Sequence, residues 1–296
     1  MVATLLASGA MKWSVLPLLV VMSACGPGSR DNNPPGGPDS NNGSNGSGQD
    51  GCSDSAKLVY VVDENNKLSQ FDPTTKMFHD LGTLNCPTAL GGMPFSMGVD
   101  RTATAWVLYD SGELFHVDTT SLACTKTNWS SQLGLDQFGM GFSTDAAGGS
   151  TDKLYIAGGS SLVMGATSKL ATLDTGSMAA TSVGTVTGWP ELTGNSNGEL
   201  WGWFPDAISP RVEKINKATG APAMTFMEPS LAGMPLAWAF AYYGGDYWVF
   251  LMKDTETSTT VYQIDGTNGT VKGMTHTGSR TIVGAGVSTC APTVIL

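Results

Sequence analysis

The side chains that could perform acid–base or nucleophilic chemistry are few and scattered along this 296-residue chain. Its three histidines, His79, His116 and His276, stand singly. His116 falls in an expected strand at a position that alternates outward, so we expect a solvated side chain rather than a general base.

The only match to a nucleophile motif is Gly-Asn-Ser-Asn-Gly at 194–198, which fits G-x-S-x-G. In serine hydrolases this motif needs a strand before it and a helix after it. Here Asn197 and Gly198 form a hairpin-turn dipeptide, and another strand-like run begins at Leu200. The sequence therefore predicts a turn and no nucleophile.

Carboxylates are the other candidates, because glycoside hydrolysis needs a positioned acid together with a base or nucleophile. The segments expected to be innermost in the fold offer Asp136 and Glu191, whereas Asp100 and Asp145 follow such segments in expected turns. Three or more carboxylates converging within about 10 Å would favour a glycan hydrolase or lyase. That function stays open as an alternative.

Missing motifs and the net charge argue against several other classes of function. No phosphate-binding glycine loop of the P-loop or dinucleotide type occurs, and no cysteine pair has the spacing of a zinc site. We therefore expect no cofactor and no metal. The net charge of -10, with only 15 basic residues, argues against a nucleic-acid partner, because phosphates need clustered Lys and Arg.

An apolar set points instead to binding. Methionine and aromatic side chains line adaptable binding surfaces, yet they also fill cores, and core packing is the favoured interpretation. If these residues ring the mouth of a channel, they would face a small apolar or glycan ligand. The candidates for ligand-facing residues are Met93, Phe95, Met97, Met140, Met234 and Trp238.

The elements that would position these residues recur five times from Lys57 onward. Each copy has an aromatic-rich strand, a turn, and a second strand that ends in Asp or Asn before a Thr/Ser/Gly turn. The spacing between copies, 42 to 56 residues, is that of a four-stranded propeller blade. The closing residues are Asp72, Asp118, Asp174, Asn216 and Asp265.

A further short apolar segment precedes four of the five copies, and the first copy lacks it. A matching segment at 282–289 follows the last copy. We expect this C-terminal strand to complete the N-terminal blade and close a ring of five blades, each with a glycine-rich innermost strand. The fold class is thus all-β, a five-bladed β-propeller, with a β-sandwich or two smaller β domains as the alternative.

Over residues 52–296 this pattern resembles the bacterial superfamily of extracytoplasmic repeat propellers, although the shared motif is only a degenerate hairpin. Within that resemblance, five-bladed propeller glycosidases use carboxylates on their inner strands. The resemblance implies an exported binding or hydrolytic domain.

Five cysteines become four if Cys25 carries lipid, and an even number in an exported chain suggests two disulfides. Four cysteines allow three pairings. Ring closure would bring Cys52 and Cys290 together, and Cys86 and Cys124, which flank the second copy, would form the other pair.

The N-terminal part predicts export. Residues 13–24 form an apolar run after Lys12, too short to span a bilayer but suited to a secretory signal over 1–24. Ser23 and Ala24 before Cys25 resemble a bacterial lipobox, in which Met22 replaces the usual Leu. Met11 is the more natural start, so we expect residues 1–10 to be a mis-assigned extension.

Residues 25–51 would then hold the lipidated cysteine and a disordered Gly/Asn/Pro/Ser linker, which contains no larger apolar side chain. The domain follows at 52–296. Gly26 after the cysteine resembles the sorting pattern of outer-membrane lipoproteins, so we expect a lipid-anchored protein of the cell envelope, in the outer membrane.

These observations predict a non-enzymatic binding or scaffolding module, held to the membrane by its lipid anchor, whose partner is an envelope protein or polysaccharide. A glycan hydrolase or lyase and a purely structural envelope protein are the alternatives.

Overall fold

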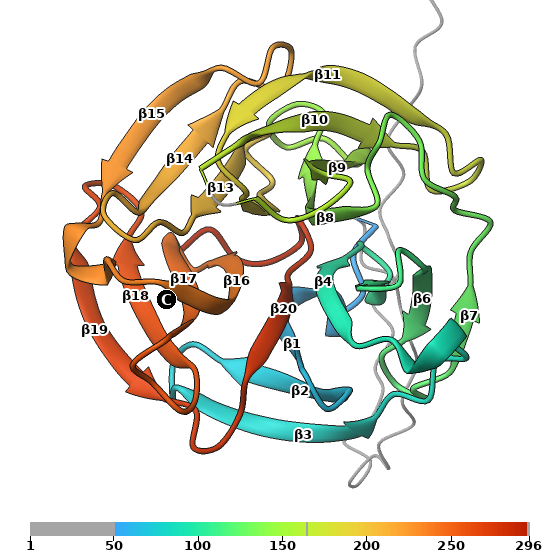
Figure 1. The fold of residues 1–296 in the computed structure, drawn as a ribbon, viewed down its shortest axis with the longest axis horizontal. Helices are drawn as coiled ribbons and strands as arrows, with labels where there is room; N and C mark the ends of the chain where they lie inside the picture. The colour runs from blue at the N-terminus through green and yellow to red at the C-terminus, as the bar shows by residue number, and fades with distance from the viewer. Residues whose placement is uncertain (1–50, 164, 295–296) are drawn as a thin grey trace, which may run out of the picture. The chain divides into compact units, whose positions relative to one another are not determined.

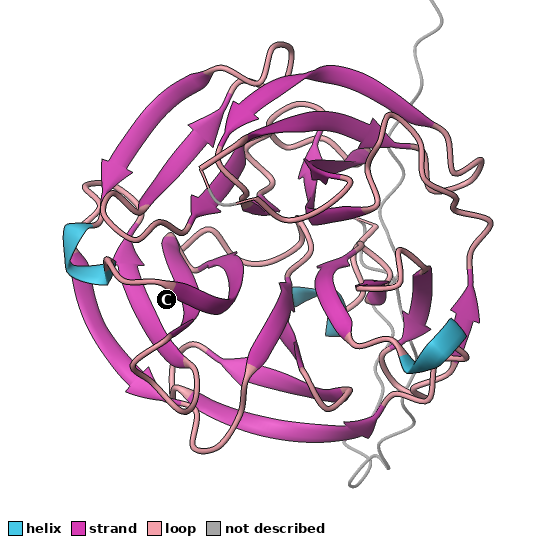
Figure 2. Cartoon of the chain, viewed as in Figure 1, coloured by secondary structure: helices cyan, strands magenta, loops and turns pink. Residues whose placement is uncertain are grey.

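The computed structural model describes residues 51–163 and 165–294, which form five four-stranded antiparallel sheets around a central axis (Figures 1 and 2). This is a five-bladed β-propeller, so the predicted fold class is confirmed. Three short 3-10 helices lie in the described loops: Ser55–Lys57, Ala89–Gly91 and Pro229–Leu231.

Each blade is given from its innermost to its outermost strand. Blade 1 contains β20 (Ile282–Gly286), β1 (Val59–Asp63), β2 (Lys67–Asp72) and β3 (Met77–Thr83). Blade 2 contains β4 (Pro94–Val99), β5 (Thr104–Tyr109), β6 (Leu114–Asp118) and β7 (Cys124–Lys126). Blade 3 contains β8 (Gln137–Thr144), β9 (Asp152–Gly159), β10 (Thr167–Leu173) and β11 (Ala180–Thr187). Blade 4 contains β12 (Glu191–Gly194), β13 (Leu200–Phe204), β14 (Arg211–Ile215) and β15 (Pro222–Met227). Blade 5 contains β16 (Pro235–Tyr243), β17 (Asp246–Lys253), β18 (Thr260–Asp265) and β19 (Val271–His276).

The ring closes as the sequence predicts. β20, from the C-terminal end of the chain, pairs antiparallel with β1, and Val61 lies opposite Ala285 (Figure 1). The innermost strand of the first blade therefore comes from the other end of the chain, which explains why the first repeat has no such segment before it.

The second strand of each blade is buried on both faces, because neighbouring blades cover it on either side. β1 and β13 have no exposed residue. The outermost strands carry the weakest sequence signal. β15 is exposed along most of its length, so its residues carry little hydrophobic alternation.

Close approach of the inner strands explains their small residues. A Cβ atom on Gly139 of β8 would lie 2.1 Å from the carbonyl oxygen of Pro190, next to β12. The prediction that every innermost strand is glycine-rich is wrong for β16, which contains alanines and no glycine. Ala239 and Ala241 pack with Ala285 of β20, since a methyl group still fits at that contact.

The five closing residues form the expected turns. Each side-chain oxygen accepts hydrogen bonds from backbone N–H groups two or three residues onward, as Asp118 does from Thr120 and Ser121 at 2.9 and 2.7 Å. These turns fix the hairpin between the third and fourth strands of every blade.

Both predicted disulfides are confirmed. Cys52 and Cys290 join the two ends of the ring, with a Cα–Cα distance of 5.8 Å. Cys86 and Cys124 tie the loop before β4 to the outer strand β7 of the same blade, with a Cα–Cα distance of 5.0 Å.

The predicted signal peptide, Cys25 and nearly all of the predicted linker lie outside the described residues. None of the helices in the described part of the chain has the length and apolar character to cross a bilayer.

Candidate functional site

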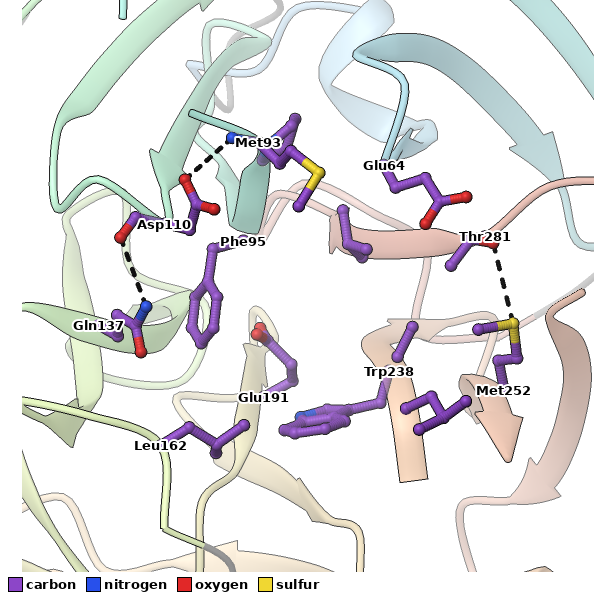
Figure 3. A pocket seen from close by; sticks show the side chains of 14 residues that line it. Glu64, Met93, Phe95, Asp110, Gln137, Leu162, Glu191, Trp238, Met252 and Thr281 are labelled. Atoms are coloured by element: carbon purple, nitrogen blue, oxygen red, sulfur yellow. Dashed lines mark hydrogen bonds between the residues drawn. The ribbon is translucent and has the colours of Figure 1, made fainter. Parts of the chain in front are cut away.

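A pocket of about 370 Å³ lies at one end of the ring of inner strands, and all five blades contribute to it (Figure 3). The described residues that line it are Glu64, Met93, Pro94, Phe95, Asp110, Gln137, Leu162, Glu191, Leu236, Ala237, Trp238, Met252, Thr281 and Val283.

The topology explains why these residues meet. Every inner strand begins at this end: Pro94, Gln137 and Glu191 are the first residues of β4, β8 and β12. The turns between the second and third strands of the blades reach the same end, and they contribute Glu64 and Asp110.

The walls are apolar and partly aromatic. Phe95 and Trp238 face the pocket from β4 and β16, and Leu162 approaches from the loop between β9 and β10 (Figure 3). At the rim, Met93 and Leu236 leave about half of their surface exposed, 52% and 55%. Such exposed apolar side chains around a concavity are typical of a binding site.

The carboxyl group of Glu191 reaches into the pocket between Phe95 and Trp238 (Figure 3). Glu191 is only 3% exposed. Its Oε2 atom accepts a hydrogen bond from the Ser96 hydroxyl at 2.9 Å, and the Met140 backbone N–H donates another. Burial raises the pKa of this carboxyl well above its ordinary value, and the two hydrogen bonds only partly oppose that effect.

Two further carboxylates lie at the rim, and both are exposed. Asp110 accepts a hydrogen bond from the Met93 backbone N–H at 2.9 Å. This bond holds the residue before β4 against the turn between β5 and β6. Glu64 lies opposite in Figure 3, and its backbone N–H donates to the Thr281 carbonyl at 3.0 Å. Three carboxylates thus face one pocket.

The structure places the six apolar candidates in three environments. Met93, Phe95 and Trp238 line the pocket. Met97 and Met140 have no exposed surface and fill core clusters between blades, because their positions on β4 and β8 point between the sheets rather than into the pocket. Met234 is 49% exposed and is not among the described lining residues.

Of the four carboxylates considered in the sequence, only Glu191 lines the pocket. Asp100 caps its own turn by accepting the Thr102 N–H at 2.9 Å, and Asp145 pairs with Lys153 at 3.0 Å. Asp136 is half-buried beside the pocket residue Gln137.

The G-x-S-x-G segment forms the β12–β13 hairpin turn, as predicted. Asn195 Oδ1 accepts the backbone N–H groups of Asn197 and Glu199. His116 is half-buried beside Trp106, and His276 shares a hydrogen bond with Thr260 at 3.2 Å. Within residues 51–163 and 165–294, no group of three or more His, Cys, Asp or Glu side chains could hold a metal ion.

Sequence reasoning missed Glu64, Asp110, Leu162 and Met252, all of which lie at or beside turns between second and third strands. Their only signal is position near the end of the aromatic-rich strand of a repeat. Glu64 and Asp110 directly follow β1 and β5, Leu162 lies three residues beyond β9, and Met252 is the penultimate residue of β17. That signal becomes useful only once the direction of the inner strands is known.

Known proteins resemble this chain only distantly. The chain matches no protein-family model, and no curated protein matches it. Among solved structures, one similar chain comes from a crystal structure of a nidogen/laminin complex, with 12% identity and a TM-score of 0.48 over 77% of this chain and 97% of that chain. Another comes from a crystal structure of a mitotic checkpoint complex, with 13% identity and a TM-score of 0.40 over 76% of this chain and 65% of that chain. Both likenesses are distant.

Proposed function

We propose that this protein is a lipid-anchored module of the cell envelope, in the outer membrane, that binds a ligand in the pocket at one end of its ring of inner strands. The observation that carries the proposal is the pocket itself, to which every blade contributes and whose aromatic walls surround one buried carboxyl group. A partner presenting that ligand, an envelope protein or polysaccharide, would dock on the same face.

The membrane anchor rests on the N-terminal sequence: the apolar run 13–24, small residues before Cys25, and a linker without larger apolar side chains. A flexible chain of that length would reach roughly 25 to 30 Å, enough to hold the propeller clear of lipid head groups. Cys25→Ser should release the protein from the membrane fraction. Unchanged membrane association in that variant would contradict the anchor.

Binding at the pocket can be tested by a thermal-shift screen with small cationic, neutral and anionic compounds and soluble oligosaccharides. At least one compound should raise the Tm of the wild-type protein, and Leu236→Ala should remove that shift. Leu236 is exposed, so its truncation should leave folding intact.

Met234→Ala is the matched control, because Met234 is similarly exposed on the same segment but is not among the described lining residues. A shift that survives Leu236→Ala, or no shift at all, would contradict binding in this pocket.

A second candidate function is hydrolysis of a glycan, which the presence of Glu64, Asp110 and Glu191 in the lining of one pocket favours. A retaining or inverting mechanism needs one carboxylic acid beside the leaving oxygen and a second carboxylate across the sugar. Hydrolysis of nitrophenyl glycosides that is lost in Glu191→Gln would favour this candidate over binding alone.

A further inference from the structure

We infer that the ligand of this pocket is a small organic cation, an ammonium group carried on an apolar body. The inference rests on the proposed binding function and adds the chemical class of the ligand.

The ionisable groups of the pocket are all acidic. Three carboxylates line it, and none of its described lining residues is Lys, Arg or His. The ion pairs formed within the described part of the chain involve other acidic residues and leave out Glu64, Asp110 and Glu191. An anionic ligand would meet like charge at Glu64 and Asp110, whereas a cation would supply the missing counterion.

Glu191 favours a cationic ligand more strongly than the two rim carboxylates do. A carboxylate buried in an apolar site loses most of its hydration and is costly unless it is paired. Its two hydrogen bonds come from neutral donors, Ser96 and the Met140 N–H. Burial favours the protonated form of Glu191 in the free protein. A cation seated beside Glu191 would favour the ionised carboxylate instead, with release of the proton to solvent, and the resulting pair would attract strongly in a site of low dielectric constant.

The hydrogen-bonding groups of the lining are mostly acceptors. One N–H of the Gln137 amide donates to the Asp110 carbonyl at 3.4 Å, and the Thr281 hydroxyl donates to Met252 Sδ at 3.8 Å. The second Gln137 N–H and the Trp238 indole N–H are the other side-chain donors of the described lining. A neutral sugar presents acceptors as well as donors, and its acceptors would find few partners here. An ammonium group presents donors and no acceptors.

The aromatic walls fit the same class of ligand. Phe95 and Trp238 lie on either side of the Glu191 carboxyl group (Figure 3). The face of an aromatic ring attracts a cation, and the indole ring does so most strongly. The methionine and leucine side chains at the rim would cover the apolar body of the ligand.

The test uses three probes with one ring and different charge: cyclohexylmethylammonium, cyclohexylmethanol and cyclohexanecarboxylate, titrated calorimetrically into the propeller at pH 7. The ammonium probe should bind about tenfold or more tighter than the alcohol, and the carboxylate should show no binding. Glu191→Gln should lower the affinity for the ammonium probe by about tenfold and leave the affinity for the alcohol unchanged.

Glu64→Gln, at the exposed rim, keeps the test decisive if Glu191→Gln fails to fold. This substitution should lower the affinity for the ammonium probe by about two- to threefold. Added salt should reduce this difference between the variant and the wild type. The Met234→Ala control should bind all probes as the wild type does.

Equal affinity for the alcohol and the ammonium probe would overturn the cation inference while leaving the pocket as a binding site. Binding of an oligosaccharide that Leu236→Ala abolishes, with no binding of the ammonium probe, would also overturn it and leave the proposed binding function standing. If no compound binds, both the cationic ligand and the binding function of the pocket are contradicted.

Discussion

The Ser96 hydroxyl donates a hydrogen bond to Glu191 Oε2 at 2.9 Å, although the two residues lie on inner strands of blades 2 and 4, with blade 3 between them. The Met140 N–H of blade 3 donates to the same carboxyl group. Glu191 therefore links three inner strands beneath the pocket while its carboxyl group faces the space above. A single side chain couples the geometry of the pocket to the packing of the ring.

Glu191→Gln should make the protein more stable at neutral and alkaline pH. The pKa of Glu191 is raised in the folded state above its ordinary value of 4.5, so the folded protein holds this proton more tightly than the unfolded chain does. Stability is then lost as the pH rises from about 4.5 toward the folded pKa. Glutamine keeps a hydrogen-bond acceptor for Ser96 and cannot ionise.

Urea unfolding at pH 5 and pH 8 would measure the effect, expected at about 1–3 kcal/mol in favour of the variant at pH 8 and less at pH 5. Glu64 and Asp110, the other titratable groups of the described lining, stay unchanged in this comparison. A variant less stable than the wild type at pH 8 would mean that the ionised carboxylate supports the ring.

Removing the ring-closing disulfide should cost more than removing the other one. The Cys52–Cys290 bond spans 238 residues and the Cys86–Cys124 bond spans 38. In the chain-entropy account a longer closed loop restricts the unfolded chain more, which gives roughly 5 against roughly 4 kcal/mol.

Paired serine variants, C52S/C290S and C86S/C124S, avoid stray thiols, and urea unfolding of both measures the difference. A greater loss in C86S/C124S would show that native-state contacts, rather than loop length, dominate.

The Asp turns should make the propeller sensitive to acid. The pKa of Asp118 is lowered from its ordinary 3.8, first by the Ser121 N–H, then by the Ser121 hydroxyl and the Thr120 N–H. Its contribution to stability is therefore present above pH 3.8 and is lost as the pH falls through the lower, folded pKa. Asp118→Asn keeps the acceptor, as Asn216 does in the fourth blade.

That variant should match the wild type at pH 7 within about 0.5 kcal/mol and lose less stability between pH 5 and pH 2. Asp118→Ala should lose about 1 kcal/mol already at pH 7. Identical acid profiles of the wild type and Asp118→Asn would contradict the assignment.

Gly139→Ala should destabilise the propeller, because the new Cβ atom would meet the Pro190 carbonyl oxygen at 2.1 Å, where backbone must move. Overpacking of this kind costs about 1–3 kcal/mol. Gly273→Ala on the outer strand β19 is the control, since its nearest neighbour is the flexible end of Lys76 at 3.4 Å. Its effect should stay within about 0.5 kcal/mol, as measured by thermal unfolding. Equal effects of the two substitutions would contradict backbone contact between inner strands.

The repeated hairpins made much of the fold predictable. An aromatic-rich strand followed by a strand ending in Asp or Asn is a local pattern, so the blades, their turns and the number five follow from short stretches of sequence. The segment at 282–289 and the positions of Cys52 and Cys290 also predicted ring closure. The first repeat lacks an innermost strand and the last repeat is followed by an extra one, so the two ends of the chain must pair.

Only the tertiary structure decided which side chains meet at the pocket. Met93 and Met97 lie four residues apart near one strand, yet Met93 is half exposed at the rim and Met97 is fully buried between blades. Strand alternation gives two faces for each strand but cannot say which one the neighbouring blades cover. Glu64, Asp110 and Glu191 are distant in sequence and line a common pocket only when five inner strands run the same way around one axis. That arrangement brings the first residues of these strands and the adjacent turns to one end of the ring.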